Sequence, residues 1–456
     1  MKLICLVLVI YSFACNATSV LNGHGYQAKS RIVVNAGIAE PVYFSSAFSH
    51  DNKYFAIAFA EKEMDSQVFI NIYQSSTGVL KYQTKVINAE VTNGHQLAFS
   101  KNNEMVIFYG LIATHQYFWK FKHSKVVVEG CNGHMGGYVE DTSEDNKTVL
   151  YRTFGDSYGS LCESDTIAKT LSFEEIDRTI QLAASEEKVR TYRKVLYQNK
   201  IIVPFSYVEG KSNAEIKIPN SIARDVELWN IDFLLSQKED RHLSLSMVDF
   251  ENKVIMLYDP APDKTIVHQW SYADKVRLQS FKLDFCVKYY SSYMMTSRYL
   301  FLETCDGEAV LLEREGHAFF KKVHFKHFRS NLVGKSSLER EALPQFLEKY
   351  LVFSNVPLIG NDTDRYEYFR VHLTTGQVNR WEIDGKVELI EPLNDEGTLL
   401  VAQKKRNGNY NDVIFDVESG EVVANLSRFI AISNNKKTLV THDKGFLTFW
   451  SKFQNL

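Results

Sequence analysis

The residues best able to do chemistry are four cysteines. Cys286 and Cys305 lie in two apolar segments that we expect to be strands joined by a turn around residues 294–296. A hairpin centred on that turn places the two cysteines opposite each other, with Cα atoms about 4.5–5.5 Å apart, which is within disulfide range. Cys131 and Cys162 then form the second predicted disulfide. Four free thiols are the alternative, and no C-x-x-C pair indicates a metal site.

A basic segment with interleaved aromatic residues runs from residue 321 to residue 329. Its cations are Lys321, Lys322, Lys326 and Arg329. Neither face of an extended strand through this segment is purely basic, so one interpretation is a solvated strand and loop. The other is a local binding site for an acidic partner or a glycan.

Signatures of catalysis and of cofactor binding are weak. Residues 155–159 match the G-x-S-x-G pattern of serine hydrolases, with Ser157 as the nucleophile. Such a domain needs alternating strands and helices, and the segments that follow resemble strands only. His324 and His327 are three residues apart, on opposite faces of a strand, which argues against a shared metal. We predict no catalytic residue, metal or cofactor, and leave enzymatic activity open.

Residues 1–18 have the pattern of a secretory signal peptide: Lys2, an apolar run from Leu3 to Cys15, and a small polar exit. Neither this run nor any later segment reaches the roughly 18 apolar residues of a transmembrane helix. We therefore expect cleavage near Ala17, no transmembrane segment, and a secreted or periplasmic protein whose compartment permits disulfides. An uncleaved anchor and lipid attachment at Cys15 are alternatives.

Asn-x-Ser/Thr sequons are as frequent as the composition alone would produce. They leave open whether the source is bacterial or eukaryotic. The four acceptor positions are Asn16, Asn146, Asn361 and Asn425.

The composition favours strands. Phe, Tyr and Trp make up 13% of the 456 residues, and only 8 are prolines. Aromatic residues suit the pleated surface of a sheet better than a helix. A net charge of -3 provides no global attraction to nucleic acid, which we exclude as a partner.

A strand-turn-strand unit recurs along the chain. The clearest copy runs from Tyr43 through a turn at residues 50–53 to Ala60. Turns at Gly78, Gly376 and Gly420 have similar contexts; the last two are 44 residues apart, and the first gap divides into six steps of about 50. A period of about 45–50 residues with four strands per unit is typical of a β-propeller.

Two tryptophan-containing segments resemble the third strand of WD40 blades: residues 227–232 and 447–451. Residues 371–376, followed by Trp381, resemble the tryptophan-docking turn of quinoprotein propellers. Over residues 31–454 the chain thus resembles the WD40-like and quinoprotein-dehydrogenase-like β-propeller superfamilies in architecture. The Gly-His and Trp-Asp pairs of WD40 repeats are absent. The resemblance implies an all-β ring of four-stranded antiparallel blades, for which we predict eight, with seven to nine possible.

We expect one propeller domain over residues 31–456, with short helical insertions near 172–190 and 336–345. The last unit, Phe429 to Phe453, holds about three strands, so Arg31–Val34 is predicted to supply the fourth and close the ring. The expected function is a secreted or periplasmic binding or scaffold module for another protein or a glycan. The alternative is a lyase, glycosidase or quinoprotein enzyme with a site in the central funnel.

Overall fold

The computed structural model describes most of the strands and the turns between them. The described residues are 21–22, 25–33, 42–60, 67–87, 95–110, 116–123, 128–129, 137–143, 148–153, 169–172, 189–191, 195–197, 200–203, 206–208, 226–228, 246–249, 252–261, 264–271, 273–274, 276–287, 293–316, 318–325, 345–355, 365–384, 387–406, 409–426, 428–443 and 445–452.

The protein is all-β, as the composition predicts, and six of its sheets are four-stranded and antiparallel, with their strands in chain order. The first two are β2 (Val42–Phe48), β3 (Tyr54–Ala60), β4 (Gln67–Gln74) and β5 (Leu80–Ile87), then β6 (His95–Phe99), β7 (Val106–Gly110), β8 (Gln116–Trp119) and β9 (Val128–Glu129). The next two are β18 (Ser246–Asp249), β19 (Val254–Ala261), β20 (Lys264–Ser271) and β21 (Val276–Leu283), then β22 (Tyr293–Met295), β23 (Tyr299–Glu303), β24 (Ala309–Glu315) and β25 (Ala318–Phe325). The last two are β26 (Gln345–Phe346), β27 (Tyr350–Asn355), β28 (Arg365–His372) and β29 (Val378–Asp384), then β30 (Val387–Pro392), β31 (Leu399–Arg406), β32 (Asn409–Asp416) and β33 (Glu421–Leu426).

A seventh four-stranded sheet, which we call the terminal sheet, joins the two ends of the chain. It contains β34 (Phe429–Ile432), β35 (Thr438–Asp443), β36 (Phe446–Lys452) and β1 (Tyr26–Val33). β1 pairs antiparallel with β36, from Tyr26 opposite Lys452 to Val33 opposite Phe446. The predicted pairing of the N-terminal strand with the last unit is therefore present, but the strand begins at Tyr26, five residues earlier than expected.

The strands between residues 137 and 228 form smaller sheets. β10 (Gly137–Thr142), β11 (Thr148–Thr153) and β12 (Lys169–Ser172) form one; β13 (Val189–Thr191) pairs with β16 (Ser206–Val208); β14 (Val195–Tyr197), β15 (Lys200–Val203) and β17 (Val226–Leu228) form a third. The β11–β12 and β15–β17 pairs are parallel, unlike the repeating antiparallel unit. Both ends of the helix expected at 172–190 lie in strands, while residues 173–188 and 331–344 lie outside the described residues.

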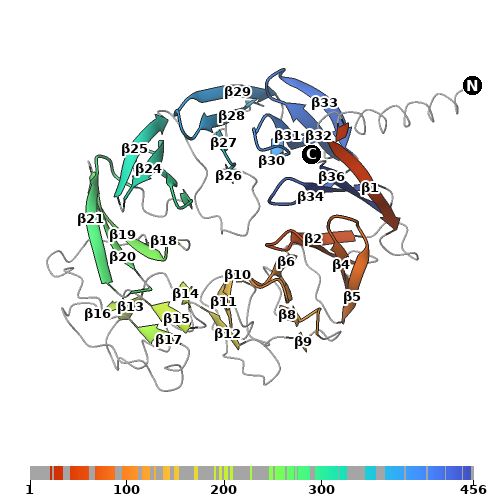
Figure 1. Ribbon diagram of the computed structural model, residues 1–456, viewed down its shortest axis with the longest axis horizontal. Helices are drawn as coiled ribbons and strands as arrows, with labels where there is room; N and C mark the ends of the chain where they lie inside the picture. Colours follow the sequence, from red (N-terminus) through yellow and green to blue (C-terminus); the bar gives the residue numbers. More distant parts are fainter. Residues whose placement is uncertain are drawn as a thin grey trace, which may run out of the picture.

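The sheets follow one another around a circle in chain order, and β1 lies beside β36 (Figure 1). Apolar side chains fill the layers between neighbouring sheets. Phe301 and Phe353 come from adjacent sheets, and their ring centroids are 4.9 Å apart. Phe55 meets Phe449 of the terminal sheet at 5.6 Å. Many of the aromatic side chains in the composition thus pack in the core between sheets.

Candidate functional site: the turn face

One end of the sheets carries two turns from each four-stranded sheet whose strands follow in chain order, and one turn from the terminal sheet. Because successive strands are antiparallel, the turn between the first and second strands and the turn between the third and fourth strands lie at the same end. We call this end the turn face. Its first turns include residues 49–53, 100–105 and 433–437, and its second turns include residues 75–79, 373–377 and 417–420.

Three of the first turns share one hydrogen-bonding pattern. In each, a buried serine donates its hydroxyl hydrogen to an Asp or Asn side chain two residues later and accepts from an amide five residues later. The carboxylate or amide oxygen lies 2.7, 2.9 and 2.8 Å from Ser49, Ser100 and Ser433, respectively. The local sequence therefore specifies these turns, as Ser, Asn and Asp do when they bond to nearby backbone.

The fourth residue of each of these turns lies in the left-handed region: Asn52, Asn103 and Lys436 have φ of 56°, 59° and 54°. Asn tolerates this conformation better than most side chains. Asn103 Oδ1 accepts a hydrogen bond from the His50 amide at 2.7 Å. Asn52 Oδ1 likewise accepts from the Asn434 amide at 3.1 Å. Turns of three consecutive sheets are thus tied to one another directly.

Lys436 extends this connection to two further sheets. Its Nζ lies 3.1 Å from Glu391 Oε1 and 3.2 Å from Gln345 Oε1, and its side chain is only 6% exposed. The buried hydroxyl of Tyr26 lies 2.5 and 2.9 Å from the carbonyl oxygens of Lys436 and Leu393, which share its single hydrogen. Side chains of five consecutive sheets, from β26–β29 through the terminal sheet to β6–β9, are therefore linked along the turn face.

The predicted basic patch is only partly described. Lys321 and Lys322 lie on β25, whereas Lys326 and Arg329 fall outside the described residues. Lys321 Nζ lies 3.1 Å from Asp284 Oδ2, and Lys322 contacts Glu313. Each described lysine is thus paired with a carboxylate, which reduces its attraction for an anionic partner.

Arg298, on the turn face, adds a cation that the sequence patterns did not single out. Its Nη2 and Nε lie 2.7 and 2.9 Å from Glu313 Oε1, and its guanidinium stands 5.4 Å from the Tyr299 ring centroid. The hydrogen bond from Lys322, together with Arg298, lowers the pKa of Glu313. Two cations therefore surround one carboxylate, and the local net charge is positive. Since Arg298 and Glu313 are 15 residues apart, only the β23–β24 pairing could have revealed them.

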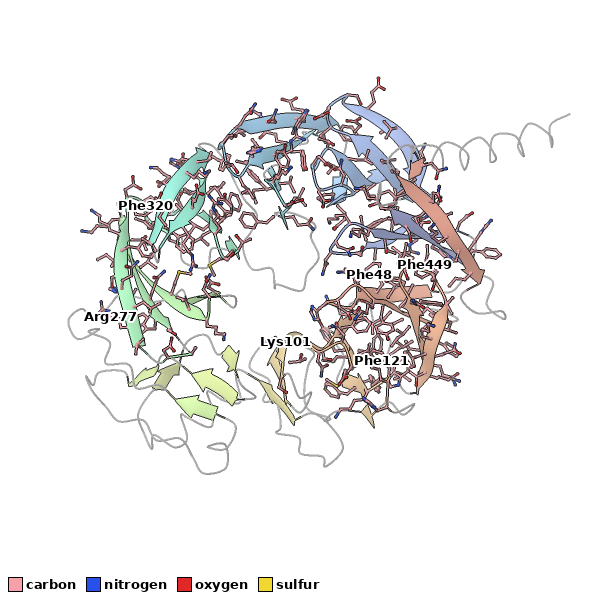
Figure 2. All side chains as sticks on the ribbon, viewed as in Figure 1. Phe48, Lys101, Phe121, Arg277, Phe320 and Phe449 are labelled. Atoms are coloured by element: carbon pink, nitrogen blue, oxygen red, sulfur yellow. A yellow bond between two sulfur atoms is a disulfide. The ribbon has the colours of Figure 1, made fainter. Side chains whose placement is uncertain are left out.

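An exposed aromatic side chain lies beside this cluster. Phe320 is directly opposite Glu313 in the β24–β25 pairing, and it is 53% exposed (Figure 2). We call Arg298, Tyr299, Glu313, Phe320 and Lys322 the Arg298 cluster. An exposed ring beside two cations can bind a segment that combines an acidic group with an apolar one.

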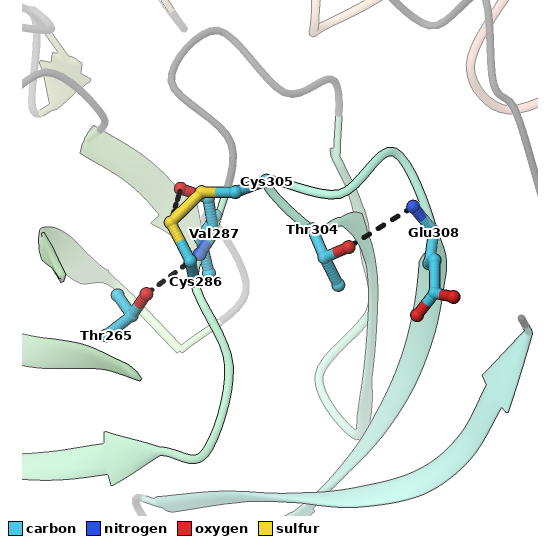
Figure 3. The surroundings of a disulfide bond; sticks show 6 residues. All are labelled: Thr265, Cys286, Val287, Thr304, Cys305 and Glu308. Atoms are coloured by element: carbon cyan, nitrogen blue, oxygen red, sulfur yellow. Dashed lines mark hydrogen bonds between the residues drawn. A yellow bond between two sulfur atoms is a disulfide. The ribbon is translucent and has the colours of Figure 1, made fainter. Parts of the chain in front are cut away.

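The expected disulfide joins Cys286 to Cys305, with Cα atoms 5.3 Å apart (Figure 3). The hairpin turn, however, lies at residues 296–299, where the Thr296 amide donates to the Tyr299 carbonyl at 2.8 Å. Val287 pairs with Thr304 and Tyr293 pairs with Leu302, so an interval of six positions on one side of the hairpin faces an interval of two on the other. The predicted turn at 294–296 is therefore wrong, although the predicted cysteine pair is present. Cys131 and Cys162 lie outside the described residues.

The remaining candidate sites gain no support. Ser157 lies outside the described residues. Within the described ranges, His, Cys, Asp and Glu side chains form no group of three suited to a metal ion. Among the same residues we find no helix with the length and apolar character needed to cross a bilayer. Trp381, which the quinoprotein resemblance singled out, packs 5.9 Å from the Tyr368 ring and 5.2 Å from the Arg370 guanidinium.

No protein-family model and no curated protein matches this sequence.

Proposed function

We propose that this protein is an extracytoplasmic β-propeller that binds an acidic segment of another protein on its turn face. The seven four-stranded sheets and the pairing of β1 with β36 support a closed ring of blades. Eight blades is our proposal, within the range of seven to nine that the sequence predicts, and the strands between residues 137 and 228 would complete the ring. The Cys286–Cys305 disulfide supports a secreted or periplasmic location.

The observation that carries the proposal is the Arg298 cluster at the end of a rigid sheet. Arg298 is 63% exposed, so its guanidinium can reach a ligand, whereas Glu313, which holds it in place, is only 21% exposed. Glu313 is in turn paired with Lys322, which is 16% exposed. A cation fixed by its neighbours loses less conformational entropy on binding than a free side chain does.

Site-specific photo-crosslinking tests this proposal. A photoreactive phenylalanine analogue at position 320 is introduced into the full chain and into two variants of it. One is Arg298→Ala/Lys322→Ala, which removes both cations of the cluster. The matched control is Lys321→Ala, on the same strand but paired with Asp284 away from the cluster.

We expect the crosslinked peptide to be acidic. We also expect its yield to fall at least tenfold in the double variant, to stay within twofold in the control, and to drop with added salt. Equal yields in the three proteins, or a crosslinked segment without acidic residues, would overturn the proposal.

A further inference from the structure

Asn425 is the one sequon acceptor that lies within the described residues. It stands on β33, between Ala424 and Leu426, which are buried in the core between the β30–β33 sheet and the terminal sheet. Because side chains alternate along a strand, Asn425 points away from that core, and its side chain is exposed. The sequence continues Leu426-Ser427, which completes the Asn-x-Ser pattern; Ser427 enters only through the sequence.

The position of Asn425 in its sheet leaves room for a bulky substituent. β33 is the last strand of the β30–β33 sheet, so one of its edges has no strand partner among the described residues. The strand starts at the turn that ends with Gly420 and leads away from the turn face. At about 3.3 Å per residue, Asn425 lies roughly 15 Å along the strand from that turn. A substituent there would cover the open edge, where strands otherwise invite pairing with another chain, and would leave the Arg298 cluster accessible.

We propose that Asn425 is an acceptor for an N-linked glycan. In this reaction Nδ2 of Asn425 forms a bond to the anomeric carbon of an oligosaccharide carried on a lipid diphosphate. The bond from that carbon to the diphosphate oxygen breaks, the amide nitrogen loses one proton, and the lipid diphosphate leaves. The sequon and the exposed side chain together supply what the reaction and the finished glycoprotein require.

The inference rests on the proposed extracytoplasmic location, and the experiment separates the two. The chain is expressed in a eukaryotic secretory host in two forms: with its own residues 1–18, and with those residues replaced by the leader of the host. The amount of protein in the medium tests export by the protein's own leader. Glycosylation of Asn425 is measured independently, on the secreted product of the second form. Enzymatic release of glycans converts a glycosylated Asn to Asp, and peptide mapping of the segment that contains Asn425 detects this conversion.

Three variants fix the assignment to this position. Asn425→Gln and Ser427→Ala should abolish conversion at residue 425, whereas Ser427→Thr should preserve it. Asn425 is exposed, and the circular dichroism spectra of all three variants should match that of the wild type. An Asn425 peptide that remains unmodified in the folded, secreted wild-type protein would overturn the proposal, whatever the behaviour of the native leader.

Discussion

The hydroxyl of Tyr368 donates a hydrogen bond to the carbonyl oxygen of Gly397, 2.8 Å away, and so joins the β26–β29 sheet to the first turn of the β30–β33 sheet. Tyr368 is fully buried, and this burial raises the pKa of its hydroxyl, which therefore stays a donor. The turn itself closes through the Gly397 amide, which donates to the Asn394 carbonyl at 3.2 Å. The backbone at Gly397 therefore lies directly at the contact between the two sheets.

Replacing Gly397 by alanine should destabilise the protein strongly. Its φ is +65°, and an added Cβ would lie 2.8 Å from Val352 Cγ1 and 3.0 Å from Leu347 Cδ1. The left-handed backbone costs about 1–2 kcal/mol and overpacking a further 1–3 kcal/mol or so. Gly420 is the matched control, because its φ is +75° but no atom lies within 4 Å of the added Cβ. Equal losses of unfolding free energy in urea for Gly397→Ala and Gly420→Ala would contradict this account.

Removing Arg314 should be far more costly than removing an exposed cation. Arg314 contacts Asp249, and the two side chains are 9% and 2% exposed. Asp249 also accepts from the Asn252 amide at 3.0 Å. Arg314→Met leaves a buried carboxylate without its cation, which costs about 3–5 kcal/mol. Lys321→Met, at a pair that is 40% and 70% exposed, should change the unfolding free energy by about 0.5 kcal/mol or less.

Tyr73 should make stability fall at alkaline pH. Its burial raises the pKa to about 12, although the hydrogen bond from Asn71 opposes the shift. Unfolded tyrosine titrates near pH 10, so above that pH only the unfolded state loses the proton. The contribution of Tyr73 is therefore fully present below pH 10 and is lost as the pH rises toward 12, by up to about 1.4 kcal/mol per pH unit.

Urea unfolding of the wild type and of Tyr73→Phe at pH 9, 10 and 11 checks this prediction. The wild type should exceed Tyr73→Phe in unfolding free energy by a constant amount up to pH 10. Above pH 10 this excess should shrink, because the wild type alone loses the contribution of Tyr73. A constant difference up to pH 11 would show that Tyr73 ionises as readily in the folded protein as in the unfolded chain.

The Cys286–Cys305 disulfide should contribute about 3 kcal/mol, since it closes a loop with a sequence separation of 19 residues. Thermal or urea unfolding of Cys286→Ala/Cys305→Ala should show this loss, and reductant should bring the wild type to a similar stability. Alkylation without reductant should label neither cysteine. For Cys131 and Cys162 the same protection stays a prediction; labelling of those two alone would mean that the second disulfide is absent.

The local sequence around three glycines correctly predicted turns at those positions. Gly78, Gly376 and Gly420, chosen from their local context, have φ of 69°, 71° and 75°, a region that glycine enters at little cost. The disulfide pair was also predictable, because two strands with a short connection have few ways to pair. The position of its turn was not, since extra residues can be inserted into one strand without changing the apolar pattern.

The candidate site shows what prediction from the local sequence could not supply. Lys321 and Lys322 were visible as a basic run, but their carboxylate partners were not, because Asp284 and Glu313 depend on which strands lie side by side. Arg298 reaches Glu313 only through the register of β23 with β24. The junction of Lys436 with Glu391 and Gln345 requires three sheets to meet.

By itself, the sequence determined the all-β class, the positions of many turns and one disulfide, because each depends on side chains within about 20 residues of one another. The tertiary structure decided how the sheets stack, which charges are neutralised and which remain exposed. Burial and ion pairing depend on contacts between sheets that are distant in the chain, such as Tyr26 with Leu393, and no local pattern encodes those distances.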